Sequence, residues 1–230
     1  MKILQNPFKA FTKFELALWA FSVTGVILSF VIPSEKDYLT LIASLCGVTA
    51  LIYNARGYVM GQILSIFFSL FYGIISIIFG YWGEALTYLG MTLPAATAAT
   101  VSWIKNPYKE SSEVRVSKMT RKKTLVMLLL AVPVTAVFYL GLWALDTPNL
   151  IVSTISITTS FIASYLTFMR SPYFALIYSL NDIVLIILWS FATAESISYL
   201  PMIACFVMFL FNDLYGFISW RRMERRQRKI

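Results

Sequence analysis

The chain has 230 residues, of which 59% are hydrophobic and 13% are charged, and its mean hydropathy is +0.74. Soluble domains carry about 25% charged residues and fewer apolar ones, so this composition excludes an ordinary soluble protein and predicts a membrane protein. The formal net charge of +8 raises nucleic-acid binding as an alternative. The distribution of the charges along the chain argues against it.

Eight apolar runs follow one another, each close to the length of about 20 residues that a membrane-spanning helix needs. They cover residues 16–32, 39–53, 58–79, 85–104, 125–145, 150–169, 173–194 and 197–220, and the second is the shortest. The runs are continuously apolar rather than alternating, which excludes the strands of a membrane barrel. The sequence therefore predicts an all-α polytopic membrane bundle of about eight transmembrane helices.

The basic residues mark one side of the membrane. With eight spans and a cytoplasmic N-terminus, every lysine and arginine except Lys36 falls on the cytoplasmic side, and the opposite loops hold Glu35, Asp37, Glu84, Asp146 and Glu195. This is the positive-inside pattern. We therefore expect a multi-pass protein of the cytoplasmic membrane with both termini in the cytoplasm, whose basic tail at 221–230 meets the lipid bilayer rather than nucleic acid.

Several kinds of chemistry are excluded by what the sequence lacks. Histidine is absent, which removes His-dependent catalytic triads and His-ligated metal sites. Cys46 and Cys205 both fall inside predicted spans, so no disulfide framework is expected. No phosphate-binding loop for ATP occurs either. We expect no metal and no cofactor.

Two parts of the chain resemble each other. R-G-Y at 56–58 and R-S-P-Y at 170–173 each join a shorter span to a longer one, and two later spans end in Ser-Trp at 102–103 and 219–220. We predict two parallel three-helix units, 39–104 and 150–220, joined by a basic linker and a central bridging helix at 105–145, with an extra helix at 14–32. In parallel-repeat transporters the ligand site lies near the midplane, where the units meet.

Polar side chains follow one face of two predicted spans. Residues three or four apart share a helix face, and a polar face in a membrane must turn toward protein or a water-filled cavity. The first such face carries Gln62, Ser65, Ser69, Tyr72 and Ser76, and the second carries Ser153, Ser156, Ser160, Ser164 and Thr167. Hydrogen bonding that only holds the bundle together is the alternative.

The last two spans hold the strongest candidates for a site. Each carries an Asn-Asp pair beside aromatic residues, and an intramembrane acidic residue is a functional-site hypothesis by default. An ion pair with a nearby arginine is the structural alternative. Pro94 is expected to kink the span that holds Tyr88. We predict a substrate-binding site made of Gln62, Tyr72, Tyr88, Tyr178, Asn181, Asp182, Trp189, Asn212 and Tyr215.

This set of side chains suits a small, flat, polar ligand that is uncharged or carries one positive charge, because aromatic faces stack on rings while amides and carboxylates bond hydroxyls and amides. No intramembrane lysine or arginine is available for phosphate. The rival class is an intramembrane enzyme that uses Asp182 and Asp213 as an acid pair. We expect these two to lie nearer opposite membrane faces, which argues against a shared proton and against an enzyme.

The segments S-Y-L-T-F-M-R-S-P-Y-F-A-L-I-Y-S-L-N-D-I-V-L-I-I-L-W (164–189) and F-N-D-L-Y-G-F-I-S-W (211–220) resemble the second repeat of the PnuC family of vitamin transporters, and R-G-Y-V-M-G-Q (56–62) is loosely similar to the first. The resemblance implies two three-helix bundles joined by a central helix. It also implies uptake of nicotinamide riboside by facilitated diffusion, with a cytoplasmic riboside kinase trapping the ligand.

The chain departs from the family pattern at positions that could set substrate choice. Phe174 and Tyr178 stand where the family often has two tryptophans, and the usual Gln and Asn of the first repeat are only partly matched by Gln62 and Tyr88. Thiamine, riboflavin and deoxynucleosides therefore remain open as alternative substrates, as does a homo-oligomeric state.

Overall fold

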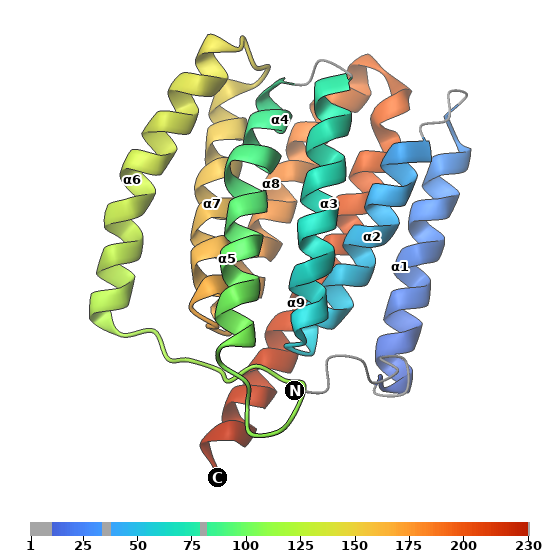
Figure 1. Cartoon of the computed structure of the whole chain (residues 1–230). Coiled ribbons are helices and arrows are strands. Elements are labelled where there is room, and N and C mark those ends of the chain that lie inside the picture. Colours follow the sequence, from blue (N-terminus) through green and yellow to red (C-terminus); the bar gives the residue numbers. More distant parts are fainter. Residues whose placement is uncertain (1–10, 34–37, 79–81, 230) are drawn as a thin grey trace.

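The computed structural model describes residues 11–33, 38–78 and 82–229, and within these ranges the chain forms helices and no sheet (Figure 1). The elements are α1 (Lys13–Val31), α2 (Tyr38–Ala55), α3 (Val59–Ile78), α4 (Trp82–Thr87), the π-helix η2 (Tyr88–Thr92), α5 (Leu93–Ile104), α6 (Arg121–Ala144), α7 (Leu150–Phe168), α8 (Tyr173–Glu195), the 3-10 turn η3 (Ile197–Tyr199) and α9 (Leu200–Arg228). Lys36 and its acidic neighbours Glu35 and Asp37 lie outside the described residues.

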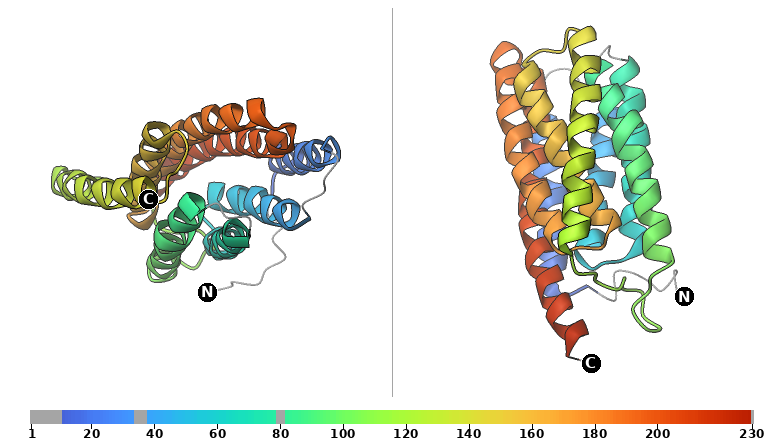
Figure 2. Two further views of the ribbon diagram at one scale, coloured as in Figure 1. Left: turned by 90° about the horizontal axis from the view of Figure 1, so that it is seen from above. Right: turned by 90° about the vertical axis from the view of Figure 1, so that its left-hand side faces the viewer.

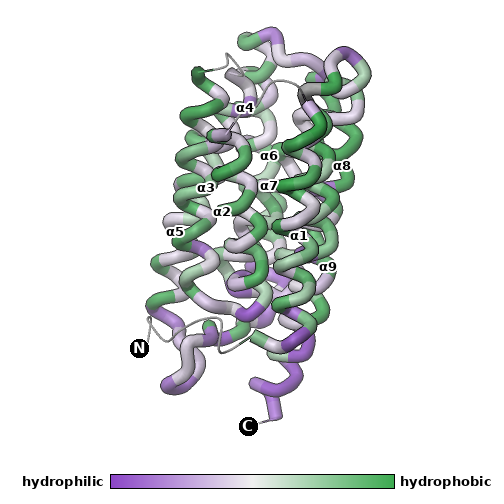
Figure 3. Tube along the Cα trace, turned by 90° about the vertical axis from the view of Figure 1, so that its right-hand side faces the viewer, coloured by the Kyte–Doolittle hydropathy of each residue, from purple (hydrophilic) through white to green (hydrophobic). Residues whose placement is uncertain are grey.

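Seven of these helices, α1, α2, α3, α6, α7, α8 and α9, are long and apolar enough to cross a membrane. The elements α4, η2 and α5 follow one another without a break and form an eighth helical segment. Figure 3 shows apolar residues along the length of the bundle and polar ones gathered at the end where α9 terminates. The prediction of an all-helical, polytopic membrane bundle is confirmed.

The eighth segment changes its hydrogen bonding just before Pro94. The Leu93 N–H donates to the Tyr88 carbonyl, one residue further back than in an α-helix. Proline has no N–H to donate, so the regular ladder must be interrupted near it, and a single π-turn is one way to do so. The helix irregularity expected at Pro94 is therefore a π-turn over the five residues that precede α5.

The helices form two groups with one helix at each edge. Viewed from above, α2, α3 and α5 lie on one side and α7, α8 and α9 on the other (Figure 2). At one edge α1 packs against α2 and α9, and at the other α6 packs mainly against α7. The bridging helix is thus central in the chain but peripheral in space, and its exposed Val132, Val137 and Leu129 suit contact with lipid.

Two buried tryptophans connect the groups at the basic end of the bundle. Trp103, near the end of α5, donates from Nε1 to the Thr167 carbonyl of α7 at 2.9 Å. Trp220 of α9 donates from Nε1 to the Asn54 carbonyl of α2 at 2.7 Å. The two rings lie 5.3 Å apart and neither is exposed. Each group of helices therefore donates one indole hydrogen bond to the other: Trp103 to α7, and Trp220 to α2.

The basic segment 221–230, expected as a tail, is a continuation of α9 as far as Arg228. Glu224 forms ion pairs with Arg221 and Arg228, which are three and four residues away and therefore on the same helix face. Glu113, in the linker after α5, pairs with Arg226. These contacts hold the linker against the end of α9.

Candidate functional site

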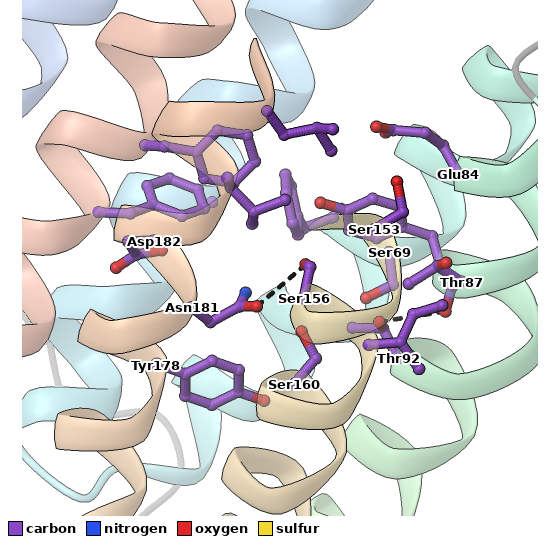
Figure 4. Close-up of a pocket in the computed structure, with 18 of the residues that line it drawn as sticks. Ser69, Glu84, Thr87, Thr92, Ser153, Ser156, Ser160, Tyr178, Asn181 and Asp182 are labelled. Carbon is purple, nitrogen blue, oxygen red and sulfur yellow. Dashed lines mark hydrogen bonds between the residues drawn. The ribbon is translucent and has the colours of Figure 1, made fainter. Parts of the chain in front are cut away.

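A cavity of about 490 Å³ lies inside the bundle, between α2, α3, the α4–η2–α5 segment, α7, α8 and α9. Figure 4 shows polar side chains from several of these helices converging on it. The polar face of α7 turns entirely to this space, since Ser153, Ser156, Ser160, Ser164 and Thr167 all line it. That predicted lining is confirmed. On α3, Gln62, Ser65 and Ser69 line the cavity, whereas Tyr72 and Ser76 do not.

Six of the nine predicted site residues line the cavity: Gln62, Tyr88, Tyr178, Asn181, Asp182 and Trp189. They come from α3, η2 and α8, which the sequence separates widely. The fold therefore brings together most of the set, although a role in binding stays a prediction.

Asn181 is oriented by two hydroxyl groups of α7. Its Oδ1 accepts a hydrogen bond from Ser156 Oγ at 3.0 Å (Figure 4). It also accepts one from Thr159 Oγ1 at 2.7 Å. Because hydroxyls donate to the amide oxygen, the Nδ2 group keeps its two N–H donors for another acceptor. Asn181 is thus a positioned donor on the wall of the cavity.

Aromatic rings provide flat surfaces beside these polar groups. The Tyr178 hydroxyl is hydrogen-bonded to Ser164 Oγ at 3.0 Å, which fixes its ring. Tyr88 packs edge-on against Phe68 at 5.7 Å, and Trp189 lies 5.6 Å from Tyr199. Such rings can stack on a planar ligand or face a cation.

Three predicted residues lie outside the cavity. Tyr72 stands behind Tyr88, with ring centroids 4.5 Å apart, and its hydroxyl contacts Met202 Sδ at 3.4 Å. Asn212 donates from Nδ2 to Ser22 Oγ on α1 at 2.7 Å.

Tyr215 donates to Glu15 Oε1 at 2.8 Å, also on α1, and the Glu15 carboxylate pairs with Arg56 at 3.1 Å. Residues three apart on α9 share a face, and that face packs against α1 rather than the cavity. Asn212 and Tyr215 therefore serve helix packing.

The expected depths of two aspartates are corrected by the structure. Asp182 and Asp213 do not lie near opposite faces, because α8 and α9 are antiparallel neighbours and each aspartate lies a similar distance from their connection. Both line the same cavity, so the expected separation of the two aspartates was wrong.

Further acidic residues line the end of the cavity that is remote from the basic segments. Glu84 lies in the first turn of α4, Glu195 ends α8, and Asp146 lies in the turn after α6. Glu84 was predicted as a loop carboxylate, but it is helical. Neither lysine nor arginine is among the described residues that line the cavity.

The sequence reasoning missed the apolar part of the wall, which includes Phe68, Phe174, Phe206 and Phe209. Phenylalanines in an apolar span carry no signal that separates a cavity wall from a lipid-facing surface. Within the described ranges no group of three or more acidic or cysteine side chains is arranged to hold a metal ion.

A polytopic helical bundle with polar groups from several helices converging on an internal cavity fits the class of membrane transporters. The chain belongs to the nicotinamide mononucleotide transporter family, whose model matches residues 37–222. It is therefore a transporter by family and not an enzyme, as expected from the sequence.

Two comparisons extend over nearly the whole chain. It is 22% identical, over 95% of its length and 85% of the relative, to the nicotinamide riboside transporter PnuC of Neisseria mucosa. Its fold is similar to a crystal structure of the vitamin B3 transporter PnuC, with a TM-score of 0.79 at 21% identity, covering 95% of this chain and 94% of the other.

Proposed function

We propose that this protein carries nicotinamide riboside across the cell membrane by facilitated diffusion. The family description names the mononucleotide, whereas the similar protein of Neisseria mucosa is named for the riboside. The two ligands differ by a phosphate group, so the charge of the cavity is the observation that decides between them.

That observation is the imbalance of charge along the cavity wall. Five acidic residues line it, namely Glu84, Asp146, Asp182, Glu195 and Asp213, and no basic side chain does so among the described lining residues. A dianionic phosphate in a dry site needs arginine, lysine or a metal ion, and uncompensated burial of such a charge is very costly. A riboside, whose pyridinium ring carries one positive charge, matches this wall.

Different side chains would hold the nicotinamide ring and the ribose of the ligand. Tyr178, Tyr88 and Trp189 offer aromatic faces for the cationic ring, an interaction worth about 0.5–2 kcal/mol per pair. Asn181 and Gln62 offer hydrogen bonds to the carboxamide and the ribose hydroxyls. Tyr72 takes an indirect part, since it supports Tyr88 from behind.

Transport would require the cavity to open to each side in turn. We assign the basic end of the bundle and both termini to the cytoplasm by the positive-inside rule. Rocking of the 39–104 unit against the 150–220 unit would alternate access, with the π-turn before Pro94 as a flexible point. A cytoplasmic kinase would then trap the riboside as its phosphate, so no coupled energy source is needed.

Ligand binding by the purified protein tests the proposal directly. Calorimetry should show saturable binding of nicotinamide riboside and none of the mononucleotide. Thiamine, riboflavin and thymidine serve as competitors, and preferential binding of one of them would reassign the substrate. Equal binding of the mononucleotide would refute the charge argument. Uptake of unchanged riboside into proteoliposomes then tests transport itself.

A further inference from the structure

Two buried polar atoms of α8 lie at the cavity without a hydrogen-bond partner. Among the described residues, Asp182 Oδ2 and Trp189 Nε1 are both buried and unpartnered, and both residues line the cavity. Leaving a buried polar atom unpaired is costly, so in a native structure it calls for an explanation such as a ligand that the atom binds. Asp182 is only 3% exposed, and its Oδ2 is the acceptor of the two atoms. The cavity therefore holds an acceptor that a bound molecule can satisfy.

The residue before Asp182 offers the opposite polarity. The amide oxygen of Asn181 is occupied by Ser156 and Thr159, which leaves the two N–H donors of Nδ2. A carboxylate only accepts hydrogen bonds, so Asn181 and Asp182 present a donor and an acceptor from consecutive positions, whose Cα atoms are about 3.8 Å apart. Figure 4 shows both side chains on α8 beside the cavity. One small group of a ligand can therefore contact both of them.

A primary carboxamide is complementary to this pair of side chains. Its carbonyl oxygen accepts a hydrogen bond and its NH2 group donates, whereas a carboxylate has acceptors and no donor. The carboxamide of nicotinamide is attached directly to the ring. Tyr178, which we assign to the ring, lies on the same face of α8 as Asp182 and one helical turn earlier, about 5.4 Å along the axis. A ring stacked on Tyr178 can thus place its carboxamide against Asn181 and Asp182.

We propose that Asp182 selects the carboxamide over the carboxylate form of the ligand: Asn181 donates to the carboxamide oxygen, and Asp182 Oδ2 accepts from the NH2 group. Nicotinic acid riboside has the same pyridinium ring and the same ribose, but a carboxylate in place of the carboxamide. Beside Asp182 that carboxylate offers no donor, and two negative charges repel each other where no described lining residue is basic. The inference rests on the proposed function, which supplies the ring, and it adds no coupled ion.

The unmodified protein should therefore distinguish three ribosides. A site that hydrogen-bonds an N–H group of its substrate rejects an analogue without that group, because the buried partner is left unpaired, so the Kd of nicotinic acid riboside should be about 100-fold higher or more. The riboside of 3-acetylpyridine separates hydrogen bonding from charge, since it keeps the carbonyl and the cationic ring but has a methyl group where the carboxamide has NH2. Its Kd should be about 5- to 150-fold higher than that of nicotinamide riboside.

Asp182→Asn tests the residue itself through the ratio of two Kd values, that of nicotinic acid riboside over that of nicotinamide riboside. An asparagine side chain can accept from a carboxamide through its oxygen or donate to a carboxylate through its NH2 group. The ratio should therefore fall by about tenfold or more. A weaker attraction to the pyridinium ring affects both ligands alike and cancels in the ratio.

Asp146→Asn is the matched control, because it removes the same charge from an exposed position at the far end of the same cavity. A general effect of negative charge on the wall would lower the ratio in this variant as well. The proposed contact predicts a ratio within about twofold of that of the unmodified protein, since water screens an exposed carboxylate. Calorimetry on the detergent-purified full chain, at one pH, measures all the Kd values.

Equal binding of the three ribosides by the unmodified protein would overturn the inference and leave the proposed function intact. An unchanged ratio in Asp182→Asn, or an equal fall in Asp146→Asn, would overturn it as well. If Asp182→Asn does not fold, the comparison of nicotinamide riboside with the acetyl analogue on the unmodified protein decides. Failure of the unmodified protein to bind nicotinamide riboside at all would overturn the proposed function, and the inference with it.

Discussion

Replacement of Asn181 by leucine tests the proposed ligand site most sharply. The amide oxygen is held by Ser156 and Thr159 at 3.0 and 2.7 Å, so the Nδ2 donors are the part of this side chain that is left for a ligand. Leucine has nearly the same size and no donor. Thr159 keeps its bonds to the backbone carbonyls of Ile155 and Ser156, so α7 loses little.

The expected loss follows from the hydrogen bond that the ligand can no longer make. A buried acceptor left without its donor costs about 1–3 kcal/mol. Since about 1.4 kcal/mol corresponds to a factor of ten, the Kd for nicotinamide riboside should rise by about 5- to 150-fold. Titration calorimetry on the purified variant measures this change.

Asn212→Leu is a matched control, because it removes the same group from the neighbouring helix α9. Asn212 bonds Ser22 on α1, outside the cavity. This variant should therefore unfold at a lower temperature while the folded protein keeps its Kd. If Asn181→Leu binds riboside within about twofold of the unmodified protein, a change below half a kcal/mol, the assigned orientation of the amide is wrong.

Three further substitutions, two of them with a control variant, test the packing of the bundle. Gly47→Ala should lower the free energy of unfolding by about 1–3 kcal/mol in thermal unfolding, because the added Cβ would lie 2.6 Å from the Phe209 ring. Gly90→Ala is its control: the added Cβ meets no atom closer than 3.6 Å, so this variant should be nearly neutral. Trp220→Phe removes one of two hydrogen bonds to the buried Asn54 carbonyl, which keeps the Gly57 N–H, and should cost about 0.5–1.5 kcal/mol in denaturant unfolding. Trp143→Phe, at an exposed position, should cost under about 0.5 kcal/mol. Glu15→Ala removes the carboxylate that Arg56, just after α2, and Tyr215 of α9 contact, so protease cleavage between α1 and α2 should become faster; unchanged cleavage would contradict this docking role.

The spacing of residues along single helices was readable from the sequence. The apolar runs predicted the spanning helices because length and hydropathy are properties of one segment. The serines of α7 were correctly assigned to a polar lining because their three- and four-residue spacing places them on one face. Asn181 and Asp182 were identified by the cost of polar groups in a membrane.

Contacts between helices were decided only by the tertiary structure. Asn212 and Tyr215 have the same polar character as the residues of α8, but the rotation of α9 turns their face toward α1, and the sequence gives no measure of that rotation. The similar depth of Asp182 and Asp213 in the cavity likewise depends on the antiparallel register of α8 and α9, which no pattern within either helix encodes.

The sequence by itself determined the class of this protein, its membrane-spanning segments and the chemistry of its polar faces, because hydropathy and helical period are local. Only the tertiary structure decided which polar residues meet, that the cavity wall carries acidic residues at its centre and far end, and that Asp182 and Asp213 line the same cavity. The physical reason is that a helix can turn a polar residue toward a cavity or toward a neighbouring helix at similar cost, and the packing of all eight segments selects between them.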